Sequence, residues 1–101
     1  MTQAPSELDL KLNRETARIP WRELQRFYAQ GAVIAVAPSL DLINVAKGFA
    51  EDNSSWIASL LENGDVARIE ASQAGRWFEE DKEVWAVVVA PWVLVQSERG
   101  E

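Results

Sequence analysis

The chain has 101 residues, 48% hydrophobic and 26% charged, which suits one globular domain with one modest core. It contains no Cys and no His, which excludes a disulfide framework, a thiolate nucleophile, a Cys/His zinc site and a Ser-His-Asp triad. The net charge of −6 is uneven, because residues 1–50 carry six basic and five acidic side chains and residues 51–101 carry four and eleven. This acidic second half argues against a surface that coats phosphates.

We expect a single domain over residues 1–101, with short flexible ends at about 1–5 and 97–101. The N-terminus has neither the charged region nor the apolar region of a secretory signal peptide. The longest apolar run is shorter than the roughly 20 residues that a transmembrane helix needs. The sequence therefore predicts a cytoplasmic protein with no membrane association.

Three helices and one strand are expected in the first half of the chain. Apolar residues recur there at intervals of three and four, and Pro or Ser stands at the predicted helix starts. Ser39 is the expected N-cap of the third helix. A run of apolar residues bounded by Gly31 and Pro38 predicts a strand covered on both faces. The expected helices span about 7–17, 20–30 and 40–51, and the strand spans 32–37.

Two helices and two strands are expected in the second half. The fourth helix, about 55–62, should bury Trp56, Ile57, Leu60 and Leu61 and end at Gly64. The fifth helix, about 73–80 with Ser72 as N-cap, should bury Ala74, Trp77 and Phe78. The strands are a half-exposed edge strand over 66–70 and an apolar central strand over 84–90. The central strand should be covered on both faces and is the expected neighbour of 32–37.

The predicted fold is α/β or α+β, with a small three-stranded, partly parallel sheet and about five helices in the order ααβααβαβ. Pro91 should end the central strand, because Pro cannot donate to a strand ladder. The apolar segment Trp92–Val95 beyond it either completes the core, which we favour, or forms a self-association surface.

Residues 42–70 resemble a winged helix-turn-helix segment, with two helices, a tight acidic turn and a strand that carries Arg68. The second of these helices, 55–62, contains no Arg, Lys, Asn or Gln that could read bases. Acidic neighbours such as Glu51 and Asp52 would repel phosphates. A nucleic-acid-associated regulator is therefore the alternative function and not the first choice.

A candidate interaction surface comes from basic and apolar residues. Four arginines follow one another at intervals of four and predict a basic ridge, although Pro20 interrupts it. If the segment beyond Pro91 forms a self-association surface instead of completing the core, it adds apolar residues. The candidate residues are Trp92, Leu94, Arg14, Arg18, Arg22 and Arg26.

No catalytic, cofactor-binding or metal-binding residues are predicted. The acidic clusters at 51–52 and 79–81 lack the spaced ligands and turn glycine of a calcium loop, and no glycine-rich nucleotide motif occurs. An enzyme built from carboxylates and a hard metal ion is a third possibility. We expect instead a non-catalytic module that binds a protein partner or associates with itself.

Three blocks of the sequence resemble one protein family. The blocks are residues 13–27, residues 39–42 and residues 85–96. Together they are similar to a family of small bacterial proteins known only as domain of unknown function 2288. The resemblance implies a bacterial cytosolic protein and assigns no catalytic residue. Polar residues inside the blocks are places to look for a functional role, with capping, turn and ladder roles as the alternative; they include Glu15, Thr16, Asp41 and Gln96.

Overall fold

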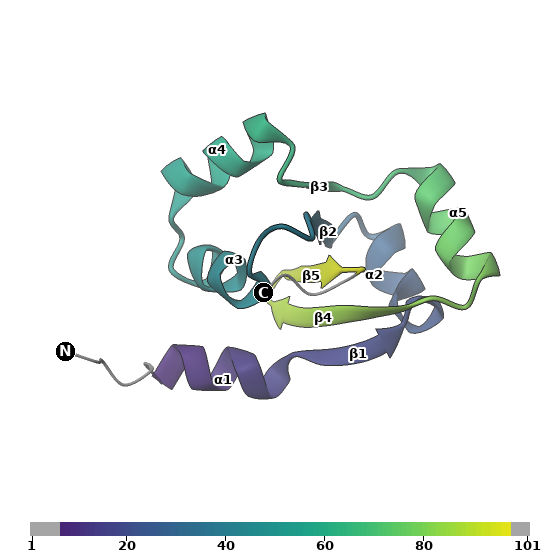
Figure 1. Cartoon of the computed structure of the whole chain (residues 1–101), viewed down its shortest axis with the longest axis horizontal. Helices are drawn as coiled ribbons and strands as arrows, with labels where there is room; N and C mark the ends of the chain where they lie inside the picture. Colours follow the sequence, from purple (N-terminus) through teal and green to yellow (C-terminus); the bar gives the residue numbers. More distant parts are fainter. Residues whose placement is uncertain (1–6, 98–101) are drawn as a thin grey trace.

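The structure, a computed structural model, describes residues 7–97 and is an α+β fold (Figure 1). The predicted flexible ends lie outside these residues except for Ser97. Within them, the helices are α1 (Glu7–Glu15), α2 (Gln25–Ala29), α3 (Leu42–Ala50), α4 (Ser54–Asn63) and α5 (Ala71–Glu79), with a 3-10 helix η1 (Trp21–Leu24). The strands are β1 (Ala17–Pro20), β2 (Val33–Val36), β3 (Val66–Arg68), β4 (Glu83–Val89) and β5 (Trp92–Gln96).

The five strands form one mixed sheet in the order β1-β4-β5-β2-β3. Strands β2 and β5 are parallel, and the other three pairs are antiparallel. Strands β4 and β5 form a hairpin in which Val89 lies opposite Trp92, and the Ala90–Pro91 peptide bond in its turn is cis. No helix within residues 7–97 is long and apolar enough to cross a membrane.

The predicted three-stranded sheet and element order are wrong, because β1 and β5 were not expected. Strand β1 has two exposed residues and no apolar alternation, so it is a strand only through its pairing with β4, where Ala17 lies opposite Ala86. Pro91 does not end the sheet here. It stands in the hairpin turn, where the ladder needs no N–H group. Strand β5 therefore separates β4 from β2, which were predicted to be neighbours.

The sheet carries an apolar core on each face, because alternate strand residues point to opposite sides. On one face, side chains from α1, α3 and α4 cover Ile34 and Leu94. On the other face, side chains from η1 and α5 cover Val33 and Val95. In Figure 1, α3 and α4 lie toward the left of the sheet and α2 and α5 toward the right.

Three of the seven residues of strand β4 are buried. Val84, Ala86 and Val87 are at most 1% exposed, as expected for a central strand. Val88, near the hairpin turn, is 53% exposed, so the prediction of complete cover is wrong at that end.

The segment after Pro91 belongs mainly to the core. Val93, Leu94 and Val95 are at most 2% exposed, and they contribute to the apolar clusters on both faces. Leu94 therefore offers no surface for a partner, whereas Trp92 is half-buried. The burial of Val93, Leu94 and Val95 supports the interpretation that this segment completes the core.

Two of the expected helix caps are replaced by neighbouring residues. Helix α3 is capped by Asp41, whose carboxylate accepts hydrogen bonds from the backbone N–H groups of Ile43 and Asn44, and not by Ser39. Ser72 lies inside α5, where Glu70 occupies the N-cap position without a side-chain hydrogen bond. The predicted left-handed end of α4 at Gly64 is confirmed, with a φ of 77°.

The cap at Asp41 gives a direct stability test. The Asp41→Ala variant is expected to lose about 1 kcal/mol of unfolding free energy, because two N–H groups of the first turn of α3 lose their acceptor. The Ser39→Ala variant should stay within about 0.5 kcal/mol of wild type, as for an exposed residue with no special role. Urea denaturation measures both. Equal losses would show that Asp41 is not the cap in solution.

Candidate binding surface and cavity

The four predicted arginines do not form a continuous ridge. They lie on four successive elements, with Arg14 on α1, Arg18 on β1, Arg22 on η1 and Arg26 on α2. Residues that are spaced four apart lie on the same side only when all of them belong to one helix. Because β1 interrupts the helical segment, Arg18 instead lies on an edge strand, 3.6 Å from the carboxylate of Glu83.

Arg22 is held against Phe78 of α5. Its Nε donates a 2.9 Å hydrogen bond to the carbonyl oxygen of Phe78, and its guanidinium carbon lies 4.8 Å from the centre of the Phe78 ring. The same Nε lies 3.7 Å from a carboxylate oxygen of Asp81. Phe78 was predicted to be buried but is 45% exposed, so the arginine covers only part of the ring.

A second arginine–aromatic pair lies one turn further along the chain. The guanidinium of Arg26 lies 5.2 Å from the centre of the Phe27 ring. Within residues 7–97, Arg26 has no ion pair. We call the group formed by Arg22, Phe78, Arg26 and Phe27 the arginine–aromatic surface. It combines two arginines with partly exposed aromatic rings, and the acidic residues 79–81 directly follow Phe78 in the chain.

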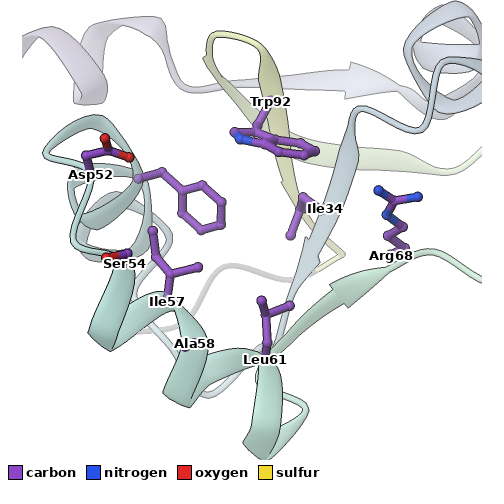
Figure 2. A pocket seen from close by; sticks show the side chains of 9 residues that line it. Ile34, Asp52, Ser54, Ile57, Ala58, Leu61, Arg68 and Trp92 are labelled. Carbon is purple, nitrogen blue, oxygen red and sulfur yellow. The ribbon is translucent and has the colours of Figure 1, made fainter.

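A cavity of about 410 Å³ lies between α4 and the sheet (Figure 2). Helix α4 was expected to bury Leu61, but this side chain is 53% exposed and faces the cavity. Trp92 lies across from it at the start of β5. The lining residues are Ile34, Phe49, Asp52, Ser54, Ile57, Ala58, Leu61, Arg68 and Trp92.

The polar groups of the cavity lie at its two ends. Figure 2 shows Asp52 and Ser54 at the α3–α4 turn and Arg68 on the opposite side. Arg68 points to the same face of the sheet as Ile34, its partner in the strand register. Within the described part of the chain, Arg68 makes no ion pair or hydrogen bond. The cavity is therefore apolar in the middle and oppositely charged at its ends.

The segment that resembles a helix-turn-helix is built into the sheet. Helix α3 buries five residues against the core, and β3 is an edge strand paired with β2. Helix α4 faces the cavity with Ile57, Ala58 and Leu61. Among residues 7–97, no group of three or more acidic side chains is placed to hold a metal ion.

The polar residues of the three sequence blocks have structural contacts. The Thr16 hydroxyl donates to the carbonyl oxygen of Leu12 at 2.6 Å, and Glu15 is the exposed last residue of α1. Asp41 caps α3, as described above. Gln96 is 1% exposed and donates to two carbonyl oxygens before α3. Capping and turn roles therefore account for three of these four residues.

Sequence reasoning did not select Phe78, Leu61 or Arg68 as binding residues. Phe78 and Leu61 fit the apolar spacing of their helices and so look like core residues. The position of Arg68 in its strand was visible from the sequence. Because side chains alternate between the two faces of a strand, Arg68 lies on the same face as Val66, which is buried. Arg68 is exposed on this edge strand, where a charged side chain also prevents edge-to-edge pairing, so the sequence alone did not mark it as a binding residue.

The family described as "Protein of unknown function (DUF2288)" matches residues 7–97, which confirms the resemblance seen in the three sequence blocks. The solution NMR structure of PA1075 from Pseudomonas aeruginosa is 44% identical, with a TM-score of 0.78 over 100% of this chain and 93% of that one. No curated protein matches the chain. The chain therefore belongs to the DUF2288 family.

Proposed function

We propose that this protein is a non-catalytic binding module that contacts a partner protein or a second copy of itself through the arginine–aromatic surface. The observation that carries the proposal is the exposed Phe78, whose ring lies under the Arg22 guanidinium while Arg22 Nε donates a hydrogen bond to the backbone carbonyl of Phe78. Arginine and aromatic residues supply much of the binding energy at protein interfaces. Because this pair is already ordered, it loses less conformational entropy when a partner binds.

The charge of the surface indicates the chemistry of the partner. Arg26 has no ion pair within residues 7–97, and Arg22 approaches only Asp81, at 3.7 Å. A partner surface with an apolar side chain for Phe78 and a carboxylate for Arg26 would complement both groups. Leu10 on α1 is also large, apolar and exposed, and it provides a matched control on another element.

The test compares tagged wild type with the Phe78→Ser and Leu10→Ser variants. Each is used to capture partners from nuclease-treated lysate of the organism that encodes the protein, and each is examined by sedimentation velocity for self-association. We expect Phe78→Ser to weaken the interaction at least about tenfold, as for an interface hot spot, and Leu10→Ser to behave as wild type. Circular dichroism confirms that the variants fold.

Two results would contradict this proposal. If Phe78→Ser captured the same partner and associated as wild type does, the arginine–aromatic surface would not be the contact. If every partner were lost on nuclease treatment, the nucleic-acid-associated alternative would replace the protein-binding module.

A further inference from the structure

The cavity between α4 and the sheet is not part of the arginine–aromatic surface, and its shape suits a small ligand. Its volume of about 410 Å³ falls within the range of about 300–1,000 Å³ that is common for small-molecule sites. Six of its nine lining residues are apolar. Leu61 is 53% exposed, and Ile57 and Trp92 are half-buried, so the chain's own side chains do not fill the space. A ligand would remove this apolar surface from water.

Arg68 determines which end group the ligand carries. It is the one cationic side chain among the lining residues, and within residues 7–97 it has no ion pair or hydrogen bond. The planar guanidinium matches the two oxygens of a carboxylate and can donate two parallel hydrogen bonds to them. Asp52 lies at the other end of the cavity (Figure 2), where it would repel a second anion.

We propose that the cavity binds a small apolar carboxylate, with its charged group at Arg68 and its apolar part between Ile57, Leu61 and Trp92. The apolar lining accounts for the body of the ligand and the unpaired arginine for its anionic end. The separation of Arg68 from Asp52 fixes the direction in which the ligand lies. This site is independent of the proposed protein-binding surface, so each can fail without the other.

The test is an NMR titration of the whole chain with octanoate and, separately, with octan-1-ol, which has the same number of carbons and no charge. We expect octanoate to shift the amide signals of Ile57, Ala58 and Leu61 and the indole signal of Trp92. Octan-1-ol should bind about fivefold more weakly, which is typical of one ion pair at a partly exposed site. The Arg68→Met variant should bind octanoate about as weakly as wild type binds octan-1-ol.

A second pair of variants tests the place of binding. Ala58 is exposed and lines the cavity, so Ala58→Trp should fill the space and abolish octanoate binding without removing a core side chain. The matched control is Ser59→Trp, because Ser59 is an exposed residue of α4 that does not line the cavity. It should bind octanoate as wild type does.

Three outcomes would overturn the inference. Equal affinity for octanoate and octan-1-ol, unchanged in Arg68→Met, would show that the cavity has no preference for carboxylate. Signal shifts at Tyr28 and Ile69 would place the ligand in a different hollow that Arg68 also borders. Absence of any shift up to the solubility limit of octanoate would show that the cavity is not a carboxylate site.

Discussion

Replacement of Gln96 by Leu is expected to lower the free energy of unfolding by about 2–3 kcal/mol. The side chain of Gln96 is 1% exposed, and its Nε2 lies 2.8 Å from the carbonyl oxygens of both Ala37 and Leu40. These bonds connect the end of β5 to the loop between β2 and α3. Leucine keeps most of the volume but supplies no donor, so the two carbonyl groups lose the amide that Gln96 provides.

The loss should be smaller than the sum of two independent hydrogen bonds. The carbonyl oxygen of Ala37 also accepts the backbone N–H of Leu40 at 3.0 Å, so it keeps one donor in the variant. The matched control is Gln30→Leu, because Gln30 is exposed and should change stability by less than about 0.5 kcal/mol. Urea denaturation of both variants measures the difference. Equal stabilities would show that the buried amide does not hold this loop.

The Gly48→Ala variant is expected to lose about 2 kcal/mol, because it places a methyl group against Trp56. A Cβ atom at Gly48 would lie 2.3 Å from Cζ3 of the Trp56 ring and 2.5 Å from Cε3. Alanine favours a helix by about 1 kcal/mol relative to glycine, which offsets part of the packing penalty. The ring of Trp56 packs beside the core of that face, so it cannot move away without loss of contacts.

The same substitution at Gly75 is the control, with the opposite expected sign. Gly75 lies within α5, and a Cβ atom there would meet no other atom within 4 Å. Gly75→Ala should therefore stabilise the protein by about 0.5–1 kcal/mol through helix propensity alone. Thermal unfolding of the two variants should show shifts in opposite directions. A stabilised Gly48→Ala variant would mean that α3 and α4 pack differently from the structure.

Features with local causes could be predicted from the sequence. The end of α4 at Gly64 depends on the left-handed conformation that glycine adopts freely. The edge position of β3 follows from its alternation of apolar and polar residues. The burial of Val93, Leu94 and Val95 follows from their unbroken apolar run.

Features that depend on distant contacts could not be predicted in this way. The strand character of β1 comes from its pairing with β4, whose residues lie more than sixty positions away in the chain. The role of Pro91 as a hairpin turn, and not as the end of the sheet, depends on the pairing of β5 with both β4 and β2. No pattern within a short window of sequence encodes either pairing.

The candidate sites also combine residues that could be selected from the sequence with contacts that could not. The arginines of the proposed surface were selected from the sequence, but their aromatic partners were not, because Phe78 has the spacing of a core residue. The cavity forms where the side chains of α4 do not reach the sheet, and only the three-dimensional packing shows this gap. Of the two apolar candidates, Trp92 is half-buried and lines the cavity, while Leu94 lies in the core.

We propose that the exposed ring of Phe78 contacts a partner protein or a second copy of the chain. The most direct test of this contact is photo-crosslinking with p-benzoyl-phenylalanine placed at position 78 and, as control, at position 10, followed by mass spectrometry. We expect a covalent adduct to one defined protein from position 78 and none from position 10. The same adducts from both positions, or none from position 78, would contradict it.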